Sequence, residues 1–285
     1  MNKLKFELEN QNRWILIDPE NSDPSINRVK KLLNLSLTSE KTKDGILFPF
    51  FPYKISGYSY TFFDLTRDRL KYFNWLRKIK NNEKIILESV NPSTGNTDLE
   101  NIALICDLIA LRNETCGGFL VHGIMLKYQE KAIILAGPSG IGKTTAACKM
   151  SDHWEICSDD LTLIVKGSDN NNNYYAHPWP GSKAYRHNEI RYNASCGVRL
   201  KNLFFIIHNT KVRIEKVNVI RALAMLKGVA EDAMALPDPS IDPKNVGVMI
   251  ENRFHNLAEF VQKVPIYELH LNKTDLFGKE IEKLL

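Results

Sequence analysis

The sequence predicts an α/β fold. Strand-like and helix-like segments alternate along the chain, an apolar strand at 132–136 runs directly into a glycine-rich loop, and a helix begins as soon as that loop ends. The chain has 285 residues, of which 44% are hydrophobic and 25% are charged, values that are ordinary for a globular protein with a substantial core. This length allows one large domain or two small ones.

The first 95 residues mix short strand and helix signals and predict a small α/β module. Segments 6–8 and 14–17 look extended, 28–35 looks helical, and 84–90 looks extended again. The turn-forming residues at 91–96, Asn-Pro-Ser-Thr-Gly-Asn, then break the pattern. We therefore expect an N-terminal module at 1–95 and a second domain at 96–285.

The second domain is expected to begin with a buried helix over 98–112, capped by Thr97 or Asn96. Strands are expected at 119–128 and 132–136, followed by a helix over 144–150. Further strands are expected at 155–158, 161–165, 204–207 and 267–271, and further helices at 219–236, 256–262 and 277–285.

Charge and cysteine usage argue against several protein classes. The net charge of +5 is mild for this length, whereas a nucleic-acid binder more often carries a basic patch. No C-x-x-C spacing suggests a zinc site or a disulfide framework, and no apolar run approaches the ~20 residues that span a bilayer. We expect a reduced, cytoplasmic protein that binds neither nucleic acid nor membranes. Its five cysteines are Cys106, Cys116, Cys148, Cys157 and Cys196.

The glycine-rich loop carries the strongest chemical signal in the chain. Residues 137–144 satisfy the pattern G-x-x-x-x-G-K-[ST] between a strand and a helix, which is the context of a phosphate-binding loop. Glycines let the backbone turn where a β-carbon would clash, and successive N–H groups then surround the phosphates. We expect ATP to be bound by Gly137, Ser139, Gly140, Ile141, Gly142, Lys143, Thr144 and Thr145.

Magnesium and a catalytic base are expected beside this loop. Lys143 would place a cation between the terminal phosphates, and the Thr144 hydroxyl would coordinate Mg²⁺. A second metal anchor usually ends a neighbouring apolar strand, and Asp159 and Asp160 follow such a strand. One carboxylate can hold the metal while the other accepts the proton of an attacking hydroxyl. A helix cap or a turn is the alternative interpretation of this pair.

His122 lies within an apolar strand, one strand before the loop. A histidine in this position is most often a core residue whose ring nitrogens are hydrogen bonded. From the residue pattern alone, both a structural and a functional role remain open.

The His122-Gly123 strand, the glycine-rich loop and the Asp159-Asp160 pair resemble, in order and spacing, the catalytic core of the HPr kinase/phosphorylase family. The nucleotide fold of that family is related to the fold of phosphoenolpyruvate carboxykinase. The resemblance covers roughly residues 115–166 and does not extend to residues 1–95. It implies that Asp159 is the base, that Asp160 and Thr144 hold magnesium, and that His122 faces the phosphates as a catalytic residue together with Lys143.

The sequence also departs from that family. A signature segment that full members carry after the aspartate pair is missing, and residues 176–183 stand in its region. This part is more similar to stand-alone relatives associated with peptide-modification systems, including the SynChlorMet cassette class. The departure counts against HPr itself as the substrate. Since full-length relatives form oligomers, a homo-oligomer is an open expectation.

Three other signals are weaker. Asn272-Lys273-Thr274-Asp275 matches the guanine-reading N-K-x-D pattern, but no D-x-x-G accompanies it, so we expect a turn after a strand. The prolines of His177-Pro178-Trp179-Pro180 fix a rigid segment, which could line an acceptor pocket or pack at a sheet edge. Three arginines could neutralise transition-state charge, and the sequence does not select among them: Arg186, Arg191 and Arg199.

These observations predict an ATP- and Mg²⁺-dependent kinase that transfers the γ-phosphate to a hydroxyl, most simply a serine of a peptide or small protein. A nucleotide-binding scaffold or regulator with little catalysis is a second hypothesis, and a kinase of a small molecule such as free serine is a third. The sequence does not name the acceptor.

Overall fold

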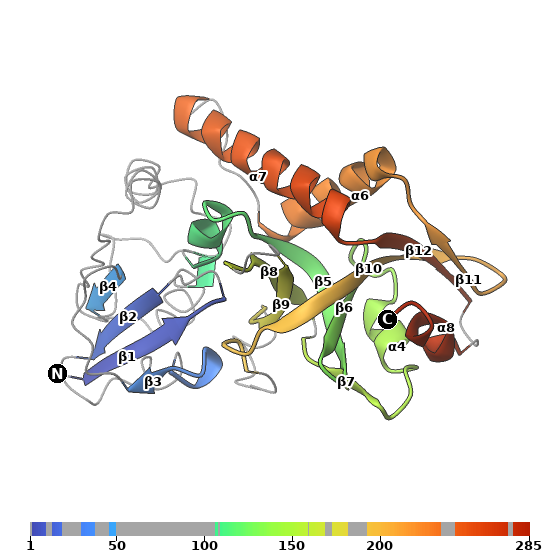
Figure 1. The fold of residues 1–285 in the computed structure, drawn as a ribbon, viewed down its shortest axis with the longest axis horizontal. Coiled ribbons are helices and arrows are strands. Elements are labelled where there is room, and N and C mark those ends of the chain that lie inside the picture. Colours follow the sequence, from blue (N-terminus) through green and yellow to red (C-terminus); the bar gives the residue numbers. More distant parts are fainter. Residues whose placement is uncertain are drawn as a thin grey trace.

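The structure is a computed structural model of the full chain. It describes residues 2–9, 13–18, 30–37, 46–49, 106–107, 109–158, 160–168, 173–181, 193–234, 243–272 and 276–285. The architecture is mixed α/β, with two sheets that lie side by side and helices that cover the larger sheet (Figure 1).

The smaller sheet is built from the N-terminal residues. Its strands are β1 (Asn2–Glu7), β2 (Arg13–Asp18), β3 (Ser36–Leu37) and β4 (Ile46–Pro49), in the order β3-β1-β2-β4. Strands β1 and β2 form an antiparallel pair, and β4 adds in parallel to β2. Both strands predicted at 6–8 and 14–17 are confirmed with shifted bounds, whereas the strand predicted at 84–90 and the domain boundary at 91–96 lie outside the described residues.

The larger sheet is mostly antiparallel and carries the glycine-rich loop. Its order is β11-β12-β10-β6-β5-β8-β9, and β7 pairs with β5. Strands β10 and β12 are parallel, as are β10 and β6. Its strands are β5 (Phe119–Tyr128), β6 (Lys131–Ala136), β7 (Trp154–Ile156), β8 (Leu161–Lys166), β9 (Tyr174–Trp179), β10 (Val198–His208), β11 (Arg213–Lys216) and β12 (Ile266–Leu271).

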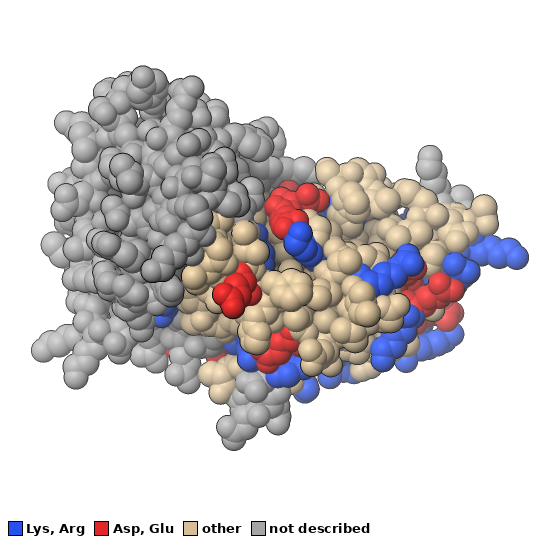
Figure 2. Space-filling view, turned by 90° about the horizontal axis from the view of Figure 1, so that it is seen from above, with Lys and Arg blue, Asp and Glu red and all other residues tan. Residues whose placement is uncertain are grey.

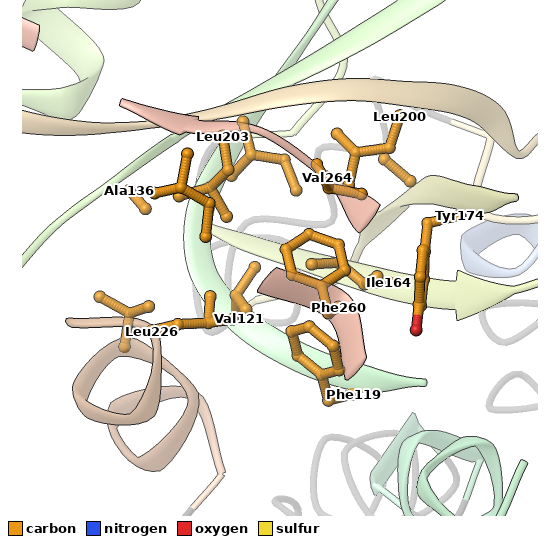
Figure 3. Close-up of a cluster of buried hydrophobic side chains, with 14 of the residues drawn as sticks. Phe119, Val121, Ala136, Ile164, Tyr174, Leu200, Leu203, Leu226, Phe260 and Val264 are labelled. Atoms are coloured by element: carbon orange, nitrogen blue, oxygen red, sulfur yellow. The ribbon is translucent and has the colours of Figure 1, made fainter. Parts of the chain in front are cut away.

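The larger sheet curls so that β9, the last strand in its order, also pairs with β10 in its central part. Strand β9 pairs with β8 along its length and also with the start of β10, where Val198 lies opposite Ala176 and Arg199 opposite Tyr175. Side chains from the curled strands gather around Phe260 (Figure 3), whose ring lies 5.1 Å from the ring of Phe119. The closure creates an enclosed apolar core directly beneath β5 and β6.

Helices cover both faces of the larger sheet (Figure 1). On one face lie α6 (Val219–Ala233) and α7 (Pro243–Lys263), which pack on the enclosed core through residues such as Leu226 and Phe260. On the other face lie α4 (Lys143–Ala147) and α8 (Gly278–Glu282). Trp154 Nε1 donates to Glu282 Oε1 at 3.1 Å, which fastens the C-terminal helix to the strand after α4.

Most elements of the second domain are confirmed, and the differences have physical causes. Residues 106–114, apart from 108, are helical up to Glu114 rather than Arg112. Helix α7 is longer than the predicted 256–262, because its first part contains Pro243, Gly247 and a continuous apolar run at 248–250 and so lacks the apolar periodicity of a helix. Neither β11 nor β9 was predicted as a strand, because β11 is mostly polar and β9 contains Pro178.

Candidate functional site

The glycine-rich loop adopts the conformation that its sequence requires. Three of its glycines have positive φ angles, +148° at Gly137, +79° at Gly140 and +93° at Gly142, which side chains with a β-carbon rarely tolerate. Gly142 is the N-cap of α4, and no side chain caps that helix end. Its backbone donors are therefore arranged for an acceptor that comes from outside the helix.

Lys143 points back into this loop. Its Nζ donates to the carbonyl oxygens of Gly137 at 2.7 Å and Pro138 at 3.1 Å, and the residue is buried. Burial lowers the pKa of Lys143, while the negative charges of Asp160 and Asp232 raise it in part. The ammonium group thus lies where a phosphate would be cradled, close enough to Asp160 to feel its charge.

His122 and Asp160 form a pair beside the loop. Nε2 of His122 lies 2.8 Å from Oδ1 of Asp160, and both side chains retain some solvent exposure, 14% and 34%. In the described structure His122 faces Asp160, and the role toward the phosphates that the family resemblance implied for it stays a prediction. The geometry brings together Lys143, His122 and Asp160, which come from three separate segments of the sequence.

A buried hydroxyl network holds the Asp160 turn against β5. The hydroxyl of Ser158 accepts from the backbone N–H of Met125 at 2.9 Å and lies 3.1 Å from the hydroxyl of Thr162. Thr162 in turn donates to the carbonyl of Gly123 at 2.9 Å. The N–H of Gly123 donates to the carbonyl of Asp160, also at 2.9 Å. These bonds fix Asp160 relative to the residue that follows His122.

Gly123 is required by this close approach. A β-carbon placed on it would lie 2.7 Å from Cγ2 of Ile134 and 3.2 Å from the carbonyl oxygen of Leu135. Sequence reasoning assigned no role to Ser158, Thr162 or Gly123. A buried serine directly before the aspartate pair is the signal that could have suggested one.

With this geometry described, comparison with known proteins decides the family. The family model of the SynChlorMet cassette protein ScmC matches residues 87–285. The chain belongs to this family. The relationship to the SynChlorMet cassette class that the sequence predicted is thereby confirmed, and the match includes the whole candidate site.

The other two comparisons do not identify a close relative. No curated protein matches this ScmC-family chain. Among solved structures, an HPr(Ser) kinase/phosphatase from Coxiella burnetii matches with 12% identity and a TM-score of 0.29, covering 58% of this chain and 87% of the other. A TM-score this low adds no support to the fold or the activity.

The residues of the ScmC-family site fit a magnesium ion in their chemistry. Mg²⁺ prefers hydroxyl, carboxylate and phosphate oxygens, and the site offers the exposed hydroxyl of Thr144 on α4 and the carboxylate of Asp160. Ser139 and Thr145 are also exposed at the loop, and Ile141 is partly buried against the core. Every predicted nucleotide-binding residue therefore lies in this one loop and the start of its helix.

Several sequence candidates do not join the described site. Asp159, Arg186 and Arg191 lie outside the described residues. Arg199 donates to Asn173 Oδ1 at 2.9 Å, and it pairs with the start of β9, whereas Asp160 packs against Gly181 beyond the end of that strand. The charge of Asp232, near the end of α6, also raises the pKa of Lys143 in part, and no sequence motif links these two residues.

The proline-containing segment that follows Asp160 is packed in the interior. Residues 177–179 belong to β9, and both His177 and Trp179 are buried. The ring of Trp179 lies 6.2 Å from the ring of Phe6 in the smaller sheet. Of the two interpretations of this rigid segment, the packing one is therefore confirmed for His177 and Trp179.

The guanine-like motif follows a strand, as expected. Strand β12 ends at Leu271, and Asn272 Nδ2 donates to the carbonyl of Thr210 at 3.2 Å. The rest of the motif, residues 273–275, lies outside the described residues. The amide of Asn272 therefore serves a backbone contact in this structure.

The described surface shows no single-sign charge pattern on the face in Figure 2, where basic and acidic side chains are interspersed. Across the residues that the structure describes, no helix has both the length and the apolar character needed to cross a membrane.

Proposed function

We propose that this ScmC-family protein is an ATP- and Mg²⁺-dependent kinase that phosphorylates a hydroxyl, with a serine of a peptide or small protein as the acceptor. The observation that carries the proposal is the convergence of Lys143, inside a phosphate-binding loop, with the His122–Asp160 pair. A nucleotide-binding loop alone would serve a scaffold equally well, whereas phosphoryl transfer also needs a carboxylate beside that loop to hold the metal, and Asp160 lies there with His122 against it.

In the proposed reaction, each residue has a separate task. Backbone N–H groups of 137–144 bind the phosphates, and Lys143 exchanges its two carbonyl partners for phosphate oxygens. Thr144 and Asp160 hold Mg²⁺, which supplies the charge that neutralises the terminal phosphates. Asp159 takes the proton of the acceptor hydroxyl as the new oxygen–phosphorus bond forms and the bond to the bridging oxygen of ADP breaks.

His122 has a positioning role in this scheme. Its Nε2 lies 2.8 Å from Oδ1 of Asp160, so the ring restricts how that carboxylate can turn toward the metal. The core type, a nucleotide fold of the HPr kinase/phosphoenolpyruvate carboxykinase kind over 96–285 with a separate module at 1–95, belongs to the same proposal. The small sheet formed by β1 to β4 is in keeping with such a module.

The test measures transfer and binding separately. Radiolabelled γ-phosphate transfer is screened against candidate peptides, small proteins and free serine, and ATP affinity is measured by titration calorimetry. Lys143→Ala should abolish tight ATP binding, since the loop loses its cation. Lys227→Ala is the matched control, because this exposed α6 lysine pairs with Glu231.

Each outcome has a defined meaning. If wild-type protein transfers phosphate to no acceptor yet binds ATP tightly, the scaffold hypothesis replaces the kinase. If free serine is phosphorylated and peptides are not, the acceptor assignment is wrong and the small-molecule hypothesis holds. Unchanged ATP affinity in Lys143→Ala would contradict the assignment of the nucleotide site to the glycine-rich loop.

A further inference from the structure

A cluster of three metal-ligating side chains lies at the outer edge of the larger sheet, away from the candidate kinase site. Glu215 on β11 lies opposite Glu268 on β12, and His270 follows two residues later on the same face. One ligand atom from each of the three can be chosen so that all lie within 4.8 Å of one another. Glu268 and His270 are buried, whereas the Glu215 side chain is 49% exposed.

The spacing of these atoms suits metal coordination better than hydrogen bonding. Nε2 of His270 lies 3.4 Å from Oε2 of Glu268 and 3.5 Å from Oε2 of Glu215. Hydrogen bonds of this type are normally about 2.7–3.2 Å long, and the buried Nε2 has no hydrogen-bond partner among the described residues. Ligands on a tetrahedral zinc ion, with bonds of about 2.0–2.1 Å, lie about 3.3–3.4 Å apart.

Neighbouring groups orient each ligand as an outer coordination shell does. Arg213 Nε lies 3.2 Å from Oε1 of Glu215, and Arg221 of α6 pairs with Oε1 of Glu268. Both arginines therefore engage Oε1, while Oε2 of each glutamate faces His270. The amide nitrogen of Asn209, whose oxygen accepts from the N–H of Thr210, lies 3.3 Å from Nδ1 of His270. Ligating carboxylates are typically held by a second polar partner, as the two arginines hold these glutamates.

We propose that Glu215, Glu268 and His270 bind a divalent transition-metal ion of the zinc class. Two carboxylates and one imidazole suit Zn²⁺ and leave a fourth position toward solvent on the exposed side of Glu215. His270 binds through Nε2 with the ring proton on Nδ1, and the Asn209 amide, whose nitrogen lies 3.3 Å from Nδ1 in this structure, rotates to present its oxygen. The two arginines neutralise part of the ligand charge, so the affinity is lower than that of a bare carboxylate pair.

The site is separate from the glycine-rich loop. Glu268 is level with Phe205 of β10 and, through it, with Ala136 at the end of β6, which is two strand spacings or about 10 Å away. Its ligands come from β11 and β12, and Arg221 extends the contacts to the first turn of α6. Bound metal would therefore fasten the edge strand β11 and this helix to the sheet, without using any cysteine.

The experiment uses the full chain and Zn²⁺ itself, in titration calorimetry near neutral pH with a competing chelator. Wild-type protein should bind one equivalent. Glu215→Gln, an exposed position that folding tolerates, and His270→Ala should each weaken binding by more than the roughly 10- to 100-fold that loss of an outer-shell partner costs. Zn²⁺ should also raise the melting temperature of the wild type and not of these variants, because ligand binding stabilises only the folded state.

Two controls keep the result specific. His153→Ala removes an exposed histidine remote from the cluster, and Cys148→Ser with Cys196→Ser removes the exposed thiols. All three substitutions should leave Zn²⁺ affinity unchanged. If Glu215→Gln binds zinc as tightly as the wild type, or if the thiol substitutions abolish binding, the proposal is overturned. Absence of Zn²⁺ binding in the wild type would overturn the proposal as well.

Discussion

Two histidine–carboxylate pairs in this molecule share their chemistry and differ in their surroundings. His122 and Asp160 lie beside the glycine-rich loop, partly exposed and 2.8 Å apart. His177 of β9 pairs with Glu9 of the N-terminal residues, and its side chain is completely buried. Nδ1 of His177 also lies 2.9 Å from the carbonyl oxygen of Ala194, so both ring nitrogens are engaged within the protein.

The difference teaches how to separate a structural histidine from a functional one. Both lie in strands of apolar neighbours, so the residue pattern treats them alike. A buried ring whose two nitrogens both have partners within the protein can exchange no proton with a substrate, whereas a partly exposed ring beside the glycine-rich loop can. His177 connects the N-terminal residues to the curled sheet, and His122 orients a group in the proposed reaction.

The exposed pair and the neighbouring Asp159 carry the largest expected effects. His122→Gln keeps a hydrogen-bonding side chain but lets the Asp160 carboxylate reorient. Phosphate transfer should fall by roughly 10- to 100-fold, the range for loss of a group that orients a metal ligand, while ATP affinity and melting temperature stay near wild type. The measurement pairs single-turnover transfer with calorimetric ATP titration. Unimpaired transfer would place His122 with His177 as a structural residue.

Asp159→Asn and Asp160→Asn divide the aspartate pair by role. Loss of the base in Asp159→Asn should lower transfer by roughly 10²- to 10⁴-fold with ATP binding retained, a larger loss than that from His122→Gln. Asp160→Asn should instead raise the Mg²⁺ concentration needed for half-maximal transfer. A magnesium titration of transfer for both variants is the check, and the reverse pattern would mean that the neighbours have exchanged roles.

The buried pair should affect stability rather than transfer. His177→Ala leaves the Glu9 carboxylate and the Ala194 carbonyl without their partner, which costs about 1–3 kcal/mol for a group left unsatisfied. The free energy of unfolding from urea titration measures this, with Glu9→Gln and the double variant completing a cycle. Transfer per folded molecule should not change, and a transfer defect in soluble, folded His177→Ala would contradict the division drawn here.

A smaller effect is expected from the network behind Asp160. Ser158→Ala removes the acceptor for the Met125 N–H, at about 1–2 kcal/mol of stability, and loosens the turn that carries the aspartates. Transfer should decrease with little change in ATP affinity, and Ser158→Thr should restore part of it. Equal transfer in Ser158→Ala and wild type would show that the turn needs no such support.

The smallest expected effect is on the free energy of unfolding and comes from the ion pair between Glu259 and Lys166. Hydrogen bonding to Lys166 is the main cause that lowers the pKa of Glu259, with burial acting against it. Because the folded-state pKa lies below the usual 4.5, the carboxylate stabilises the fold above that pH and loses its contribution as the pH falls through the folded-state value. Glu259→Gln should cost about 0.5 kcal/mol at pH 7 and nothing at strongly acidic pH, measured by urea unfolding at both.

How much the sequence predicts differs between the loop and its surroundings. The glycine-rich loop, its flanking strand and helix and the family relationship follow from a local pattern, because each residue there meets a backbone requirement of its own. The pairing of His122 with Asp160 depends on how β5 lies against the turn after β7, which no local pattern contains. The proximity of Asp232 to Lys143 depends on the packing of α6, far away in sequence.

The sequence did not predict strands β11 and β9, because neither has the apolar pattern of a typical strand. Strand β11 reads Arg-Ile-Glu-Lys at the sheet edge, and β9 contains a proline in its second half. Pro178 pairs with Thr162 of β8 and lies beyond Tyr175 and Ala176, the residues through which β9 pairs with β10, so it occupies an edge position of the kind to which proline is confined in sheets. Both strands are determined by their neighbours rather than by their own composition.

The curled sheet has a consequence for how the protein keeps from associating through its strands. An open strand edge offers unpaired backbone groups to a second molecule and is a starting point for aggregation. Where β9 meets β10, the sheet covers part of one such edge with itself, and the proline beyond that contact removes a donor. The opposite edge is β11, a short strand in which Arg213, Glu215 and Lys216 place charges against any incoming strand. The two edges of the sheet are thus protected from pairing with another molecule in different ways, one by self-pairing and proline and the other by charge.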